Sequence, residues 1–446
     1  MEFFDKFVIP QSLEHINLLH YLATLVLYIF IPFISIVFGS TLLSLVYKRK
    51  AHKTSDSRLN TLSNDLISMF TVNKNVGIIL GIVPLFTLTI IYAQLLNSAE
   101  NNSISYLFIA SLLMIVALIF IYTYRYSVSF NLIFNSIKDF KTKDSQVNNE
   151  IKKLDKTTKK LSLNTGHYGL ILLTLSVWFY LAGLNLALYT ELSVTHSLLE
   201  ALFSINVLSR LLFFVTFAMG ITGSAILFRF FFWEGGVKNL DKEYKILVKT
   251  VAIKTSFYFL ALVPLFLIIY LATLPKTSLS TSVFVYSGLV IFGLFVCYNV
   301  LYSLTKEEKV SSNGLLFFVL ILTMCFSLTK DQLVMNNSNV LHSLKLNEKY
   351  DALYASLTGG TKVVEVSGAD VFKVRCTPCH AFDYKIVGPP YNETMPKYEG
   401  KINDLVSFIL NPKKVNPEYP PMPNPGLKPN EAKAVAKYIL DEFKKK

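Results

Sequence analysis

Two cysteines and a histidine near the end of the chain form the sequence Cys376-Thr377-Pro378-Cys379-His380. Side chains of this type and spacing can bind a metal ion, form a redox-active disulfide or attach a haem. A zinc site needs further ligands at matching spacing, but no cysteine or histidine follows His380. A thioredoxin-like dithiol needs a βαβ context, whereas the preceding SGADVFKVR has the pattern of an amphipathic helix. The motif therefore predicts covalent haem c, with a chance match of three fixed positions as the alternative.

The segments around the motif occur in the order typical of class I c-type cytochromes. A helix with Gly368 and Phe372 leads into the motif, and VGPPYNET follows it. Two further predicted helices, INDLVSFILNPKKV and KPNEAKAVAKYILDEF, are separated by YPPMPNPGL. Residues 364–446 therefore resemble class I c-type cytochromes, which implies a small all-α domain with one haem c.

The resemblance also implies which residues bind the haem. In the VGPPYNET loop, Pro389 or Pro390 would pack on the haem. A backbone carbonyl would accept a hydrogen bond from Nδ1 of His380, which fixes the orientation of the imidazole. The residues implied in haem binding are Cys376 and Cys379 as covalent attachments, Pro389 and Tyr391 as packing residues, and His380 and Met422 as axial ligands of the iron.

The sixth ligand of the iron has two candidates. Met422 lies between two prolines just before the last predicted helix, and Met395 also precedes a proline, in ETMPKY. The fixed φ angles of proline make the loop around Met422 stiff. A stiff loop can hold a weak thioether ligand at a constant distance, so we favour Met422.

The rest of the chain has the composition of a membrane protein. Of the 446 residues, 52% are hydrophobic and 16% are charged, whereas soluble domains have about 25% charged residues. A membrane-spanning helix needs about 20 mostly apolar residues. Eight such segments are predicted, at 17–47, 75–97, 105–129, 167–190, 207–233, 251–274, 281–303 and 313–330, with a short amphipathic helix at 197–206.

The expected fold is therefore all-α and has three parts. A polytopic membrane helix bundle occupies residues 1–330, a periplasmic linker with some helix occupies 331–363, and the cytochrome c domain occupies 364–446. The start of the chain lacks a basic leader and a small-residue cleavage site. The first apolar segment is therefore expected to remain as a membrane helix.

Basic residues alternate between the predicted loops. The loops after the first, third, fifth and seventh segments carry several lysines or arginines, as in YKRKAHKTSDSR, while NSAENNS and PKTSLS carry few. Lysine and arginine are retained on the cytoplasmic side. The pattern therefore places both termini on the periplasmic side of a bacterial inner membrane. It also explains most of the net charge of +13 without nucleic-acid binding, for which the chain has no motif.

The first 230 residues or so are similar to the large subunit of bd-type quinol oxidases. The shared residues are Pro32, Gly39, Gly81, Pro84, Leu85 and Tyr92. Those oxidases bind b and d haems through histidines within their spans. Here Phe30 stands where the histidine of the first span would fall, and the fifth segment has no histidine. The b-haem positions of the family are therefore absent from this sequence.

Other residues of the membrane part have simple expected roles. Cys297 and Cys325 lie in apolar runs and are expected to pack as small hydrophobic residues. Arg210, at the outer end of the fifth segment, is expected to be interfacial. A b-type haem held by His20 and His196 near the outer surface is an alternative to interfacial histidines.

These features predict a membrane-anchored monohaem c-type cytochrome that transfers single electrons at the periplasmic face of a respiratory chain. Its expected partners are other respiratory redox proteins and the lipid bilayer. The alternative is a quinol-oxidising or terminal-oxidase-like subunit with a second redox site in the membrane, where Glu100 and Glu200 could accept quinol protons. A third hypothesis is a redox sensor that signals through the cytoplasmic loop at 131–166. The sequence leaves open whether the chain is itself an enzyme.

Overall fold

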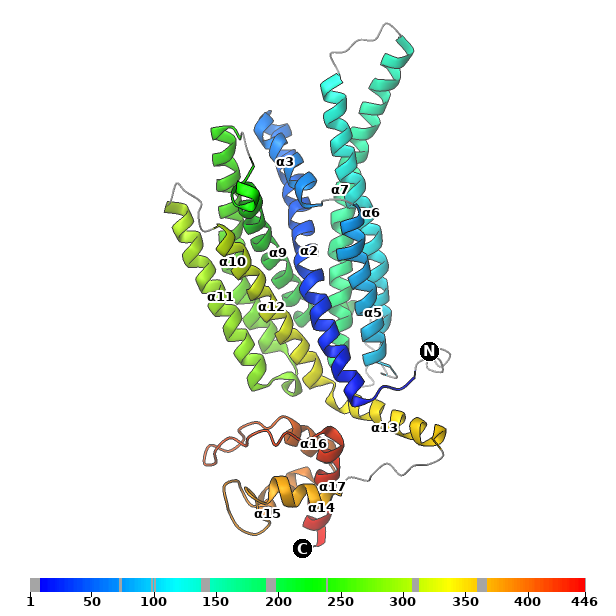
Figure 1. Cartoon of the computed structure of the whole chain (residues 1–446), viewed down its shortest axis with the longest axis vertical. Helices are drawn as coiled ribbons and strands as arrows, with labels where there is room; N and C mark the ends of the chain where they lie inside the picture. Colours follow the sequence, from blue (N-terminus) through cyan, green and yellow to red (C-terminus); the bar gives the residue numbers. More distant parts are fainter. Residues whose placement is uncertain are drawn as a thin grey trace.

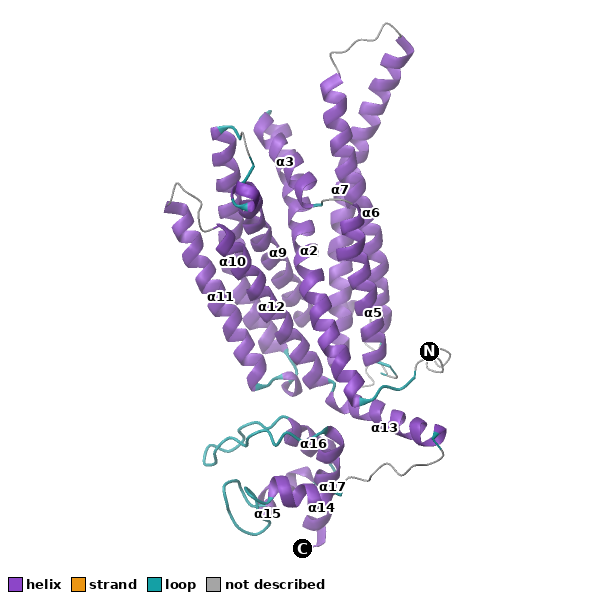
Figure 2. Ribbon diagram, in the orientation of Figure 1, coloured by secondary structure: helices purple, strands orange, loops and turns teal. Residues whose placement is uncertain are grey.

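The computed structural model describes residues 9–71, 74–97, 99, 102–137, 145–189, 198–237, 240–306, 313–358 and 367–445. These residues form helices joined by loops, and none of them belongs to a β-strand (Figure 2). The all-α expectation is therefore confirmed for this part of the chain.

Among the described residues, eight helical segments are long and apolar enough to span a membrane, as predicted. The second segment combines α4 (Lys74–Gly77), the π-helix η1 (Ile78–Ile82) and α5 (Val83–Leu95). The other seven spans are α2 (Leu13–Thr54), α6 (Ser103–Ile137), α7 (Ser145–Leu186), α9 (Ile205–Phe231), α10 (Lys242–Thr273), α11 (Thr281–Lys306) and α12 (Asn313–Ser338). The short helices α3 (Ser57–Phe70) and α8 (Leu198–Phe203) lie between spans.

Helix α2 lies between two groups of spans, with α5, α6 and α7 on one side and α9 to α12 on the other (Figure 1). Small residues allow α2 and its neighbours to pack closely. A Cβ atom on Gly39 of α2 would lie 2.7 Å from Cβ of Thr222 on α9. A Cβ on Gly223 of α9 would lie 2.8 Å from the backbone nitrogen of Ser256 on α10. Such close helix contacts give membrane bundles much of their packing energy.

Helices extend further into the polar segments than the apolar pattern predicted. Helix α12 continues through residue 330 to Ser338, and α13 (Val340–Leu357) follows almost at once. Much of the predicted linker at 331–363 is thus helical. At the other end of the bundle, α6 and α7 extend into the predicted loop at 131–166, and project beyond the other spans (Figure 1). Apolar length marks the membrane-embedded part of a helix but not its end, because backbone hydrogen bonds continue into the polar region.

The C-terminal domain is a separate group of helices below the bundle (Figure 1). It contains α14 (Gly368–Val371), the π-helix η5 (Phe372–Cys376), α15 (Tyr391–Thr394), η6 (Met395–Tyr398), α16 (Ile402–Leu410) and α17 (Pro429–Lys445). Helix α14 crosses α17 so closely that a Cβ on Gly368 would lie 2.7 Å from the carbonyl carbon of Ala434. A side chain larger than hydrogen at position 368 would force these two helices apart.

The C-terminal domain contacts the membrane bundle at two places. Leu344 of α13 belongs to the apolar core of the C-terminal domain, and Glu348 of the same helix pairs with Lys433 of α17. The ammonium group of Lys413 donates a hydrogen bond to the carbonyl of Lys276, in the loop between α10 and α11. The domain is therefore placed at one end of the bundle.

Candidate functional site

The predicted motif begins where η5 ends at Cys376. The backbone turns sharply there, because the amides of Cys379 and His380 both donate hydrogen bonds to the carbonyl of Cys376, at 3.1 and 2.9 Å. The amide of Gly388 then donates to the carbonyl of Cys379 at 2.9 Å. These bonds fold the following loop back over the motif, so that residues 388–391 lie against His380.

The imidazole of His380 is held by its neighbours. Its Nδ1 lies 3.0 Å from the carbonyl oxygen of Pro389, and because a carbonyl only accepts, Nδ1 carries the proton and donates. The ring of Tyr391 stacks on the imidazole, with centroids 5.1 Å apart and an interplanar angle of 27°. The expected hydrogen bond from the VGPP segment is thus present, at Pro389. It leaves the lone pair of Nε2 available to a metal ion.

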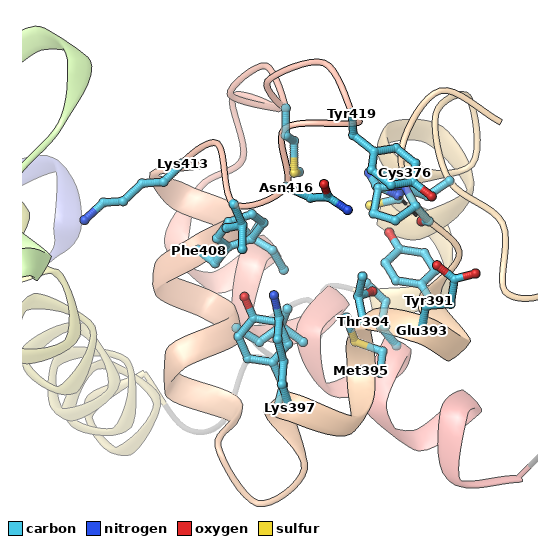
Figure 3. Close-up of a pocket in the computed structure, with 18 of the residues that line it drawn as sticks. Cys376, Tyr391, Glu393, Thr394, Met395, Lys397, Phe408, Lys413, Asn416 and Tyr419 are labelled. Atoms are coloured by element: carbon cyan, nitrogen blue, oxygen red, sulfur yellow. Dashed lines mark hydrogen bonds between the residues drawn. The ribbon is translucent and has the colours of Figure 1, made fainter. Parts of the chain in front are cut away.

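A cavity opens beside the imidazole, and Figure 3 shows the side chains that surround it. The volume of this cavity is about 250 Å³. Apolar walls come from residues such as Leu405, Phe408 and Ile409 of α16. Five of the predicted site residues line this cavity: Cys376, His380, Pro389, Tyr391 and Met422. The sixth, Cys379, is half-buried and is not part of the cavity wall.

Both methionine candidates lie on the wall of the cavity. Met395 is buried at the start of η6, with 3% of its surface exposed, whereas Met422 is half-buried in the loop before α17. That loop is braced by Asn424, whose side-chain amide donates to the carbonyl of Leu410 at 3.1 Å and whose side-chain oxygen accepts from the amide of Gly426 at 2.9 Å. Either sulfur is therefore placed to take part in binding, and the choice of Met422 stays a prediction.

Burial controls the protonation of the thiol at Cys376. Burial raises its pKa above the ordinary value, an effect that a hydrogen bond with Tyr391 partly offsets. The pKa of the Tyr391 hydroxyl is also raised, chiefly by burial and then by the neighbouring thiol. Reactive redox thiols need a lowered pKa, so Cys376 does not have the electrostatics of a thioredoxin-like dithiol. Nor does any cluster of three or more potential metal-ligating His, Cys, Asp or Glu residues occur in the described part of the chain.

These residues fit a c-type haem. A thiol and an oriented imidazole with a free Nε2 meet at one mainly apolar cavity, with methionine sulfurs on its wall. Sequence reasoning missed the role of Gly388: a Cβ there would lie 2.7 Å from both ring nitrogens of His380. Its place in the VGPP segment, immediately before the expected carbonyl acceptor, is the signal that could have revealed it.

The membrane bundle contains a buried charge cluster that the sequence did not predict. Arg210, which was expected to be interfacial, is buried inside the bundle, with 7% of its surface exposed. Its Nη2 lies 3.8 Å from Oδ2 of Asp331 on α12, and Nζ of Lys330 lies 3.1 Å from Oδ1 of the same carboxylate. Both cations also lie over the ring of Tyr270, at 5.0 and 4.5 Å from its centroid. The polar residues at 331–332 were interpreted as the start of a linker, because sequence alone does not show that they face the bundle interior.

Only some of the other residues predicted to matter in the membrane part are among those that the structure describes. His20 lies on α2, beside Gln332 of α12. His196 and Glu100 lie outside the described residues, so a pairing of His20 with His196 stays a prediction. Cys297 is buried in the apolar core, as expected, and Cys325 is half-buried.

Comparison with known proteins identifies relatives of the C-terminal domain. The family model for cytochrome c matches residues 366–441. Cytochrome c-551 of Pseudomonas denitrificans is 35% identical over 79 residues, and cytochrome c-551 of Azotobacter vinelandii is 35% identical over 78 residues. Each alignment covers 95% of the relative but 17% of this chain. No solved structure matches the chain significantly.

Proposed function

Because the chain belongs to the cytochrome c family through residues 366–441, we propose that it is a membrane-anchored monohaem c-type cytochrome that transfers single electrons at the periplasmic face of a respiratory chain. The cytochrome c domain implies electron transfer and covalently bound haem c. The orientation of His380 by Pro389 and Tyr391 is the observation that carries the proposal. It presents Nε2 of His380 as a ligand beside the buried Cys376 thiol.

The side chains of the domain have distinct roles in this proposal. Cys376 and Cys379 would hold the haem through thioether bonds, and Nε2 of His380 would bind the iron. The carbonyl of Pro389 accepts a hydrogen bond from Nδ1–H and so increases the basicity of Nε2, the ligand nitrogen. When bound, the haem supplies a one-electron couple between ferrous and ferric iron. A histidine–methionine ligand pair raises the reduction potential of this couple.

We propose that Met422 would be the second protein ligand of the iron. It is the more exposed of the two methionines on the cavity wall, and its loop is fixed by flanking prolines and by the hydrogen bonds of Asn424. Met395 is already packed into the core of the domain at 3% exposure. Withdrawing Met395 toward the cavity would leave a void in that core, whereas Met422 can face the cavity without such a cost.

The fold supports a periplasmic position for the domain and for both termini. Lys413 contacts the loop between α10 and α11, which is one of the loops poor in basic residues. The start of α2 lies at the same end, where the amide of Leu13 donates to Oδ1 of Asn347 on α13 at 3.0 Å. Because basic loops stay in the cytoplasm, this end of the bundle is the outer one. The expected partners are redox proteins of a bacterial inner membrane.

The proposal is tested with the full chain, produced in cells that attach haem c and purified in detergent. A pyridine haemochrome spectrum should show one haem c per chain, which stays attached after denaturation. A redox titration should follow a single one-electron curve. Replacing Cys376 and Cys379 with alanine should remove the haem, while the matched Cys297→Ala and Cys325→Ala pair should retain it. Haem that is released by denaturation would overturn the proposal.

A quinol-binding subunit is the second candidate function, because the bundle contains a cavity at its buried charge cluster. Arg210, Lys330 and Asp331 line this cavity together with the aromatic rings of Phe213 and Tyr270. Charged residues within membrane spans commonly mark functional sites. This candidate predicts that a short-tailed quinol reduces the haem of the full chain and that Lys330→Met slows the reduction. Equal rates in the two proteins would exclude a quinol site at this cavity.

A further inference from the structure

A groove lies at the end of the bundle farthest from the cytochrome domain, between α2, α3, α6 and α7. Its volume is about 910 Å³. Basic side chains of α2 and α7 form one part of its lining: Lys48, Arg49, His52, Lys53, Lys159 and His167. Apolar side chains from α2, α6 and α7 form the other part, namely Leu45, Val128, Leu132 and Leu163.

The basic part of the groove has an excess of positive charge. Asp56 is the one carboxylate in the lining, and it pairs with Arg58 at 3.3 Å. Lys159 pairs with Asp155 at 2.6 Å. The lysines and the arginine of α2 that line the groove, at 48, 49 and 53, form no ion pair within the described part of the chain. Lys48 donates instead to Oγ of Ser162 at 2.7 Å. The groove is therefore electrostatically complementary to an anion.

The apolar part of the groove is exposed. Leu132 of α6 and Leu163 of α7 have 47% and 46% of their surface accessible. Lys48 and Arg49 directly follow the apolar run of α2, and His167 directly precedes the apolar run of α7. The groove thus lies where the apolar surface of the bundle changes to a charged surface. A ligand that fills it needs a negatively charged group attached to an apolar chain.

We propose that this groove binds an anionic phospholipid. The phosphate group lies against Lys48, Arg49 and Lys53, and an acyl chain follows Leu132 and Leu163 toward the membrane interior. Basic pockets between membrane helices at the cytoplasmic side are suited to anionic headgroups, particularly those with two phosphates. A free phosphate could occupy the basic part but would gain nothing from the apolar wall. The inference is independent of the cytochrome function, because it concerns the opposite end of the bundle.

The test measures lipid retention by native mass spectrometry of the full-length haem-loaded chain in detergent. Cardiolipin is titrated against phosphatidylcholine of matched chain length, with inorganic phosphate as a competitor. Cardiolipin should bind at least tenfold more tightly than phosphatidylcholine, and millimolar inorganic phosphate should not displace it. Because each basic residue near an anionic headgroup contributes about fivefold, the combined Lys48→Met, Arg49→Gln and Lys53→Met variant should lose on the order of 100-fold in affinity.

A matched triple variant separates a site from general surface charge. Lys152, Lys153 and Lys156 are exposed on the projecting part of α7 and are not part of the groove. Their replacement by methionine removes the same charge from the same end of the molecule and should leave cardiolipin binding unchanged. If the first variant does not fold, replacing the exposed Lys53 and Lys159 should lower the affinity about 30-fold. Equal loss in the matched variant, equal binding of phosphatidylcholine, or displacement by phosphate would each overturn the proposal.

Discussion

Replacing Gly388 with alanine should disturb the iron ligand while leaving the covalent attachment intact. The added Cβ would contact Cε1 of His380 and lie 2.7 Å from both ring nitrogens. Ordinary van der Waals contact begins at 3.4 Å, so the ring nitrogens must move by at least the difference, about 0.7 Å, and Cε1, which is nearer still, must move further. The ring cannot simply swing away, because Pro389 holds its Nδ1 and Tyr391 stacks on its face.

A displacement of this size has consequences that can be estimated. It is enough to lengthen the 3.0 Å hydrogen bond to Pro389 beyond the usual range of about 2.7–3.2 Å. It also exceeds the tolerance of about 0.5 Å that a functional constellation allows. Overpacking costs about 1–3 kcal/mol and the lost hydrogen bond about 1 kcal/mol. Gly388→Ala should therefore lower the free energy of unfolding of the cytochrome domain by about 2–4 kcal/mol.

The measurements are the absorption spectrum, the reduction potential and chemical denaturation followed at the haem. Gly388→Ala should retain covalent haem but show a weakened histidine bond and a shifted potential. Gly400→Ala is the control, since a Cβ on Gly400 would meet no atom within 4 Å, and the φ of this residue is 70°. It should cost about 1–2 kcal/mol of backbone strain without changing the spectrum. A wild-type spectrum and potential in Gly388→Ala would refute the reasoning.

Three further predictions concern other parts of the chain. Met422→Ala should abolish the near-infrared sulfur-to-iron band of the oxidised protein while Met395→Ala retains it; the opposite result would assign Met395 as the ligand. Asp331→Asn leaves two buried cations without a carboxylate, which should cost about 3–5 kcal/mol and lower the temperature at which a thiol-reactive dye labels the buried Cys297; an unchanged temperature would contradict this. Burial, with a smaller contribution from nearby lysines, lowers the pKa of His342 to about 4. Because the unfolded chain then binds the proton more strongly, stability should fall as the pH decreases from about 6.5 to about 4, and a His342→Leu variant that keeps the same slope would exclude this histidine as the cause.

The helical architecture could be predicted because hydrophobicity and charge act locally. Each span is marked by some 20 apolar residues, and the structure has eight segments that meet this criterion. The environment of the polar stretch after residue 330 was harder to predict. Lys330 is 1% exposed. In the sequence, however, a lysine followed by an aspartate looks the same whether the pair is buried in a cluster or solvated in a linker. Only the packing of α12 against α9 distinguishes the two.

The cytochrome site was predictable to a different degree at each residue. Cys376, Cys379 and His380 are close together in the chain, so their spacing alone restricts the chemistry. A carbonyl acceptor for His380 and the Met422 loop could be proposed because the order of segments resembles a known family, but only the structure identifies Pro389 as the acceptor. The place of Gly388 in the VGPP segment could have suggested a role, but its contact with the ring of His380 depends on a loop that folds back over the motif.

The sequence by itself determined the attachment chemistry, the helical fold class and the number of spans. All three depend on residues that are neighbours in the chain, through thiol spacing, apolar length or loop charge. The tertiary structure alone decided how Pro389 and Tyr391 orient His380, that Arg210 and Asp331 meet inside the bundle, and that basic and apolar residues from separate helices share one groove. The physical reason is that these features join side chains that are not neighbours in the chain, and only the folded loops and the packing of the helices specify which of them come into contact.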